Sequence, residues 1–229
     1  GKKVDMTTED AEITNNTYAM LMTVEGDEQA IGYVSLGSLN EKVKAVKVED
    51  VEATAENVSN GTYKIARPFN IAFKADGQSD LSKDFIAYIM SAEGQAIINE
   101  HGYVGSNDAA AYEGNGAEGK LVVGCSSSVS PVMEKLIEAY KAVNPKADIE
   151  LQTTDSTTGM TAAIDGTYDI GMACRELKDD EAAALSHQAI AMDGIAVIVN
   201  QANPTDELSV EQIGSIFTGD LTKWDEIVK

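Results

Sequence analysis

Three short segments of the sequence combine the residue types that bind a small anion. They are residues 124–131 (GCSSSVSP), 153–159 (TTDSTTG) and 171–176 (GMACRE). Hydroxyl groups and the free backbone N–H groups of a helix start donate hydrogen bonds to anions. Arg175 adds a forked cation suited to two oxygens of a tetrahedral anion. Helix capping is the alternative, because Ser and Thr are favoured at helix starts anyway, but two such segments with an arginine favour an anion site.

The elements around these segments predict where they meet. From residue 120 onward the sequence alternates strands (120–125, 149–153, 168–174, 195–199) with helices (131–144, 158–165, 179–185, 209–216). This alternation predicts a parallel α/β sheet with right-handed crossovers. Ligands of such sheets bind beyond the carboxyl ends of the strands. The three segments all follow predicted strands, so we expect them to lie together at one edge of the sheet.

The first half of the chain has a different pattern of predicted elements. It predicts helices at 15–23, 51–60, 82–90 and 93–99, strands at 30–35 and 43–48, and an extended stretch at 63–74. Pro68 interrupts that stretch, which suits an edge strand or a crossing between lobes. Residues 103–120 have linker composition without apolar periodicity and mark the clearest boundary in the chain.

Charge restricts the partners of this protein. The 38 acidic residues outnumber the 17 basic ones and give a formal net charge of −21. Such a surface repels nucleic acid and anionic lipid, and no basic cluster compensates for it. We therefore expect no nucleic-acid partner. An anionic ligand would have to be held by local dipoles and hydrogen-bond donors.

Enzymatic chemistry has little support in the residues. The two histidines, His101 and His187, have no metal-like spacing and no evident nucleophile partner. Two cysteines are too few for a zinc site or a disulfide framework. We expect no catalytic residues, no metal and no cofactor. A hydrolase that uses the Ser126 to Ser128 cluster is the remaining enzymatic alternative.

No apolar run approaches the ~20 residues of a membrane span. The residues after Gly1 lead straight into polar sequence, without the pattern of a signal peptide. Export is therefore not readable from the beginning of the sequence.

Several longer stretches resemble a known family. Residues 120–229 resemble the amino-terminal half of the phosphate-binding proteins of ABC uptake systems, and residues 12–104 resemble the carboxyl-terminal half. The matching stretches are 126–131 (SSSVSP), 155–159 (DSTTG), 166–177 (GTYDIGMACREL), 193–197 (DGIAV), 216–224 (IFTGDLTKW), 31–36 (IGYVSL), 61–68 (GTYKIARP) and 91–95 (SAEGQ).

The resemblance implies an α/β, periplasmic-binding-protein-like type II fold, with two lobes that close around a cleft like a hinge. It implies capture of inorganic phosphate for delivery to an ABC permease in the membrane, without catalysis. The location would be extracellular or periplasmic, with a lipid anchor as a further option. Another oxyanion, such as sulfate or molybdate, and a non-binding scaffold module are the alternatives.

The resemblance also implies the site. The anion contacts map onto Ser127, Ser128, the N–H of Val129, Ser156, Thr157, Cys174 and Arg175. Asp155 and Asp193 are candidates for a carboxylate that accepts a hydrogen bond from protonated phosphate and so rejects sulfate.

Three departures accompany the resemblance. The two halves stand in swapped order, which implies either a circular permutation or a fragment that spans two tandem units. A middle segment of the family with a second-lobe binding loop is absent. Lobe I would span 68–193, including the linker 105–119, and an incomplete lobe II would combine 1–67 and 194–229. Cys174 stands where the family has Ser or Asp, and it forms either a disulfide with Cys125 or a free thiol.

Overall fold

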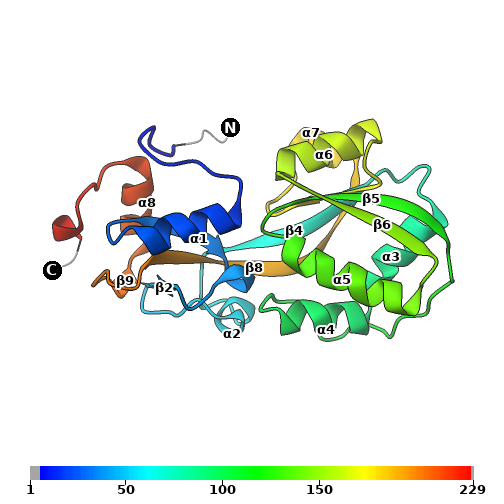
Figure 1. Ribbon diagram of the computed structural model, residues 1–229, viewed down its shortest axis with the longest axis horizontal. Coiled ribbons are helices and arrows are strands. Elements are labelled where there is room, and N and C mark those ends of the chain that lie inside the picture. The colour runs from blue at the N-terminus through cyan, green and yellow to red at the C-terminus, as the bar shows by residue number, and fades with distance from the viewer. Residues whose placement is uncertain (1–5, 228–229) are drawn as a thin grey trace.

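The computed structural model describes residues 6–227, apart from the side chain of Cys125, and shows a long mixed sheet flanked by helices (Figure 1). The strands of this sheet follow the order β1-β8-β4-β7-β5-β6, and β2 pairs with β8 beside that path. Their bounds are β1 (Ile31–Ser35), β2 (Val43–Ala45), β4 (Ala66–Phe73), β5 (Gly119–Ser126), β6 (Ala147–Thr154), β7 (Ile170–Ala173) and β8 (Ser186–Asn200). Two short strands, β3 (Lys47–Val48) and β9 (Glu207–Leu208), form a separate parallel pair.

Helices cover both faces of the sheet on the side that contains β5, β6 and β7 (Figure 1). One layer holds α3 (Asp80–Met90), α4 (Ala92–Glu100) and α5 (Ser130–Val143), and the other holds α6 (Ser156–Asp165) and α7 (Asp179–Ala184). These elements, with most of β4 and the first part of β8, form lobe I. The parallel strands β5, β6 and β7 lie between the two layers, as the strand–helix alternation predicted.

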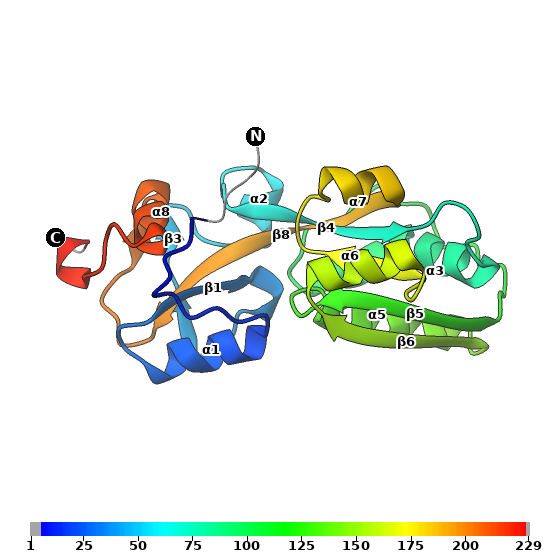
Figure 2. The same cartoon turned by 90° about the horizontal axis from the view of Figure 1, so that it is seen from above.

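Lobe II lies at the other end of β8 (Figures 1 and 2). It contains α1 (Thr17–Gly26), α2 (Ala55–Ser59) and α8 (Val210–Thr218), together with β1, β2, β3, β9, the second part of β8 and two short 3₁₀ turns at Leu36–Ser38 and Trp224–Glu226. Both ends of the described chain lie in this lobe (Figure 1).

Two antiparallel strands join the lobes. β4 and β8 pair from Ala66 opposite Gly194 to Phe73 opposite Ser186, with a register shift at Phe69 and Asn70. The buried residues divide along these strands. A large cluster, with members from Phe69 to Ala191, and a small one, with members from Ala72 to Leu185, lie within lobe I, and two further small clusters belong to lobe II. This distribution supports a division near residues 68 and 193, which we retain as a proposal.

Local sequence explains the helix starts that matter for the site. Pro131 occupies the first turn of α5, where its missing N–H is no loss. The side chain of Asp155 caps α6 by accepting from the N–H groups of Thr157 and Thr158. Gly166 ends α6 in the left-handed region at φ 87°.

Two sequence expectations need correction. β8 begins at Ser186, so the strand predicted at 195–199 is only its second half, and His187 lies within this strand. The predicted linker 103–120 contains no helix before β5, but it packs firmly against lobe I. Asp84, 3% exposed, accepts from the hydroxyl of Tyr112 and from the N–H of Asn115. This segment is therefore a fixed strap rather than a flexible connection.

Within residues 6–227, no helix has the length and apolar character needed to cross a bilayer.

Candidate functional site

A cleft between the lobes collects the hydroxyl-rich segments that the sequence singled out. Its cavity measures about 210 Å³. Lobe I contributes the ends of β5, β6 and β7 and the first residue of α6, and lobe II contributes residues around the start of α1 and the middle of β1. The carboxyl ends of the parallel strands thus meet at one edge, as expected. Three helices, α1, α5 and α6, begin at or beside this cleft.

Ser126 has the clearest binding geometry in the first segment. Its side chain lines the cleft and is 6% exposed. Among the residues that the structure describes, its Oγ has no hydrogen-bond partner. A buried hydroxyl without a partner loses about 1–3 kcal/mol of solvation. A ligand oxygen in the cleft would recover that loss.

Ser126 was not among the predicted anion contacts, and the groups of this segment that were predicted are partly engaged. Ser127 donates from Oγ to the carbonyl of Asn15 (2.7 Å), and its Oγ lies 3.2 Å from the Thr17 hydroxyl, so it links the two lobes. Ser128 lines the cleft. The N–H of Val129 donates to the carbonyl of Ser126 (2.9 Å), so this group closes the turn before α5.

The start of α6 adds a carboxylate and a hydroxyl. Asp155 lines the cleft, and its pKa is lowered because it accepts from the Thr158 hydroxyl and from the backbone N–H groups of Thr157 and Thr158. Ser156 accepts from the N–H of Cys174 (3.2 Å). Thr157 is exposed and does not belong to the cavity lining.

Arg67 is the cation of the cleft, and it was missed as a site residue. It stands opposite Asp193 on the two crossing strands, and its Nε donates to Asp193 Oδ2 at 3.0 Å. One guanidinium nitrogen lies 3.4 Å from the sulfur of Cys174. The side chain is 18% exposed and lines the cavity. The signal for it in the sequence is its position in the stretch 61–68 (GTYKIARP), which resembles the family.

Asp193 holds Arg67 and does not line the cavity. It is fully buried, and Oδ1 accepts from the Ser35 hydroxyl (2.7 Å) and the N–H of Leu36 (3.1 Å). Burial raises the pKa of this carboxyl, while Arg67 and the other donors act in the opposite direction. Asp193 therefore connects lobe II, the crossing strands and the cation.

Arg175 points elsewhere. It makes a two-pronged ion pair with Glu181 at 2.7 and 2.8 Å, and it is absent from the cavity lining. Burial acts to raise the pKa of Glu181, but hydrogen bonds from Arg175 and from the N–H of Lys178 outweigh it, so the pKa is lowered. The arginine that sequence spacing favoured thus braces α7 in this structure.

Cys174 lines the cleft as a free thiol, half-buried beside Ser156 and Arg67. Of the two alternatives that the sequence left open for Cys174, this structure has the free thiol; the side chain of Cys125 lies outside the described part of the chain. The cavity lining includes neither His101 nor His187, so the serine cluster has no histidine base beside it among the described residues. Those residues include no group of three or more His, Cys, Asp or Glu side chains placed to hold a metal ion.

Comparisons with known proteins identify the family of this chain. The model of the family described as "PBP superfamily domain" matches residues 110–228. The phosphate-binding protein PstS 2 of Streptococcus agalactiae is 49% identical over 230 residues, which cover 100% of this chain and 78% of that protein. The protein of the same name from Streptococcus pneumoniae is 42% identical over 227 residues, 99% of this chain and 78% of that protein.

A crystal structure shows the same fold. It is that of a phosphate-binding protein of a phosphate ABC transporter from S. pneumoniae, with a TM-score of 0.79 and 42% identity, covering 99% of this chain and 88% of the solved one. Each alignment runs through the whole chain, so the streptococcal relatives have the same order of segments. A circular permutation relative to other phosphate-binding proteins stays a prediction.

Proposed function

We propose that this chain, which belongs to the phosphate-binding proteins of the PBP superfamily, captures inorganic phosphate. The proposed binding site is the cleft between its lobes. Delivery would be to the permease of an ABC transporter in the membrane. The family consists of solute-binding proteins of transporters, so the chain is not an enzyme.

The observation that carries this proposal is that one cavity is lined by both Arg67 and Ser126, whose hydroxyl has no hydrogen-bond partner within residues 6–227. The protein as a whole is strongly acidic, and long-range attraction would oppose the approach of an anion. A fixed guanidinium and buried donors act at short range, where they overcome this repulsion through charge-assisted hydrogen bonds. The starts of α5 and α6 add the positive ends of two helix dipoles.

The remaining predicted contacts complete the proposed shell. Ser128 and Ser156 reach the same cavity, and Cys174 supplies a weak donor beside Arg67. Ser127 now bonds to lobe II, so phosphate would exchange that bond for one to its own oxygen as the lobes adjust. We place Val129, Thr157 and Arg175 outside the direct shell. The N–H of Val129 donates to the carbonyl of Ser126, the N–H of Thr157 donates to the side chain of Asp155, and Arg175 pairs with Glu181.

Selectivity against sulfate is assigned to Asp155. Phosphate near neutral pH retains a proton and donates a hydrogen bond, whereas sulfate has none to donate. Asp155 lines the cleft, and its lowered pKa keeps it an acceptor. Asp193, the other sequence candidate, is occupied with Arg67, Ser35 and Leu36.

We place the protein outside the cytoplasmic membrane, extracellular or periplasmic, where a solute-binding partner of an uptake permease acts. A lipid anchor on the full-length protein is the finer form of this proposal. Mass spectrometry of the membrane fraction from cells that produce the full-length protein would detect the acyl-modified terminus. A protein recovered unmodified from the medium would contradict the anchor.

Calorimetric titration tests the function. Protein stripped of phosphate is titrated with phosphate, with sulfate and with molybdate, with and without reductant. The proposal expects saturable heat with phosphate alone. Tighter binding of sulfate or molybdate would assign another oxyanion. No heat from any anion, with a folded protein by circular dichroism, would identify a module that does not bind.

A further inference from the structure

Cys174 places a free thiol in the wall of the anion cleft, directly after β7. Its Sγ lies 3.4 Å from a guanidinium nitrogen of Arg67 and 3.6 Å from the hydroxyl oxygen of Ser156. The N–H of Cys174 donates to that same oxygen at 3.2 Å, so the backbone beside the thiol is fixed. The side chain is half-buried and lines the cavity of about 210 Å³, so a small molecule in the cleft reaches the sulfur.

A second, independent group shows that the surroundings of this thiol suit an anion. Ser126 lines the same cavity, is 6% exposed, and has no hydrogen-bond partner for its Oγ within residues 6–227. Arg67 uses its Nε for Asp193, while Nη1 is directed at the sulfur of Cys174. A carboxylate that binds to Ser126 and Arg67 would therefore share the cavity with a reactive sulfur.

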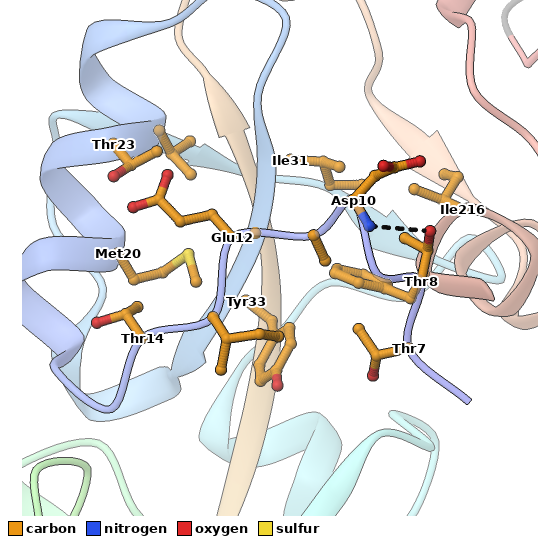
Figure 3. Close-up of a pocket in the computed structure, with 15 residues that line it drawn as sticks. Thr7, Thr8, Asp10, Glu12, Thr14, Met20, Thr23, Ile31, Tyr33 and Ile216 are labelled. Carbon is orange, nitrogen blue, oxygen red and sulfur yellow. Dashed lines mark hydrogen bonds between the residues drawn. The ribbon is translucent and has the colours of Figure 1, made fainter. Parts of the chain in front are cut away.

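The larger cavity beside the cleft has the opposite charge. This groove beside β1 lies between α1 and α8, measures about 470 Å³, and shares Thr14, Met20 and Tyr33 with the cleft (Figure 3). Its lining, within the described part of the chain, contains the carboxylates of Asp10 and Glu12 but neither a cysteine nor a basic side chain. An anionic reagent is therefore favoured in the cleft and opposed in the adjoining groove.

We propose that Cys174 is a site of thiol–disulfide exchange for small disulfides that carry a carboxylate, and that the resulting mixed disulfide excludes phosphate from the cleft. The exclusion of phosphate rests on the proposed function, whereas the exchange itself does not. The proposed location outside the cytoplasmic membrane is an oxidising environment in which disulfides persist, so reagents of this class are available there.

The exchange needs no further oxidant. The thiolate of Cys174 attacks one sulfur of the disulfide, a new S–S bond forms to Sγ, and the S–S bond of the reagent breaks. The other half leaves as a thiolate and takes up a proton from solvent, in place of the proton that Cys174 gave up. Cys174 is thereby oxidised and the departing half is reduced. The attached half stays in the cleft with its carboxylate beside Arg67, where phosphate would otherwise bind.

Charge separates this site from an ordinary surface thiol. The net charge of −21 attracts cations to the surface as a whole and opposes anions. A thiol on that surface would therefore react faster with a cationic disulfide than with an anionic one of similar length, and a cation beside the sulfur reverses this order. Asp155 also lines the cleft, but its two oxygens accept from Thr157 and Thr158 at the start of α6. The order of the two rates at Cys174 thus shows whether Arg67 dominates.

The test compares dithiodipropionate, a disulfide with two carboxylates, with cystamine, a disulfide of similar length with two ammonium groups. Each reacts with the full 229-residue chain after reduction and removal of reductant and phosphate, and mass spectrometry of peptides follows the label on Cys174. Dithiodipropionate should label Cys174 about tenfold faster than cystamine does. Thr23→Cys, at an exposed position in the groove beside β1, is the matched control in a chain that also carries Cys174→Ala, and it should show the opposite order.

The role of Arg67 is tested by its removal. Arg67→Met should abolish the anionic preference at Cys174. The double change Arg67→Met with Asp193→Asn gives the same readout in a chain without an unpaired buried carboxylate, so the result does not depend on a destabilised variant. Calorimetric titration of the chain labelled on Cys174 should show no saturable heat at phosphate concentrations that saturate the unlabelled chain, and dithiothreitol should restore it.

Three results would overturn the inference. One is a folded, reduced chain whose Cys174 reacts no faster with dithiodipropionate than with cystamine. Another is an anionic preference that survives the removal of Arg67. The third is a labelled chain that binds phosphate as tightly as the unlabelled one. The labelling rates are measured without phosphate, so a chain that labels as expected but binds no phosphate when unlabelled would contradict the proposed function and leave the exchange site in place.

Discussion

Lobe I packs a large buried cluster against α3, α4 and α5 and a small one against α6 and α7, whereas lobe II divides its buried residues between two small clusters and, within residues 6–227, leaves one edge of its sheet unpaired. The strap at residues 103–118 closes lobe I, and Asp84 fixes it from inside. In lobe II, the groove beside β1 has no comparable cover among the described residues.

This difference indicates which lobe shapes the ligand site. Lobe I presents its hydroxyls and helix starts on a rigid frame, so their positions are set before an anion arrives. Lobe II contributes the start of α1 and, through Asp193 and Ser35, a link to Arg67 at the crossing strands. We expect lobe I to determine the donors and lobe II to determine how firmly the cleft closes.

The largest effect should come from the cores. Phe85 is fully buried in the lobe I cluster, and Ile216 is only half-buried in lobe II. Phe85→Ala should lower the free energy of unfolding by about 3–5 kcal/mol, and Ile216→Ala should lower it by about 1 kcal/mol or less. Urea denaturation of both variants measures the difference. Equal losses would show that lobe II is as closely packed as lobe I.

Next comes the cation of the cleft. Arg67→Met should reduce phosphate affinity about 100-fold, since a truncated buried charge pair loses about 2–5 kcal/mol. It should also destabilise the protein, because Asp193 remains buried without its partner. The double change Arg67→Met with Asp193→Asn should recover part of the stability but none of the affinity.

Arg175→Met is the matched control for this prediction, since Arg175 pairs with Glu181 outside the cavity. Its phosphate affinity should change less than threefold. A larger loss for Arg175→Met than for Arg67→Met would return the role of cation to Arg175, as sequence spacing first favoured.

A smaller effect is expected for Ser126. Ser126→Ala removes a buried hydroxyl that has no partner within the described chain, so the free energy of unfolding should not fall. Phosphate affinity should fall about tenfold, because a hydrogen bond to a charged group is worth about 1.5–3 kcal/mol. Thr205→Val removes another such hydroxyl far from the cavity lining and should change neither quantity. A Ser126 variant with unchanged affinity would remove this hydroxyl from the shell.

The smallest effect concerns Asp155. Asp155→Ala should cost about 1 kcal/mol at pH 7 through loss of the α6 cap. The pKa of Asp155 is lowered by folding, so its contribution is present above the unfolded pKa of about 3.9 and is lost as pH falls through the folded value. The difference in urea midpoint between Asp155→Ala and wild type should therefore shrink in acid.

Asp155→Asn retains a capping side chain and serves as the control for stability. It should leave the urea midpoint at pH 7 nearly unchanged and narrow the preference for phosphate over sulfate. A preference that stays intact in this variant would assign the discrimination to another group.

The strand–helix pattern predicted the architecture of lobe I well because its parallel strands lie between two helix layers and its longer helices are amphipathic. It also placed Ser126, Ser156 and Cys174 at one edge, since parallel strands end together. It did not find Arg67. Ligands of parallel sheets bind beyond the carboxyl ends of the strands, but no such rule indicates which residue of an antiparallel strand between two lobes contacts a ligand. The pattern wrongly favoured Arg175 as the cation of the site, because sequence spacing cannot show that Glu181 lies within reach of its guanidinium.

Diffraction from crystals of the chain with bound phosphate, with arsenate as an anomalously scattering substitute, tests the central claim most directly. The account predicts one anion in the cleft, with its oxygens within hydrogen-bond distance of Ser126 Oγ and the Arg67 guanidinium and with Asp155 close to the protonated oxygen. An anion bound at Arg175, or a cleft that holds none at a concentration that saturates the calorimetric titration, would contradict it.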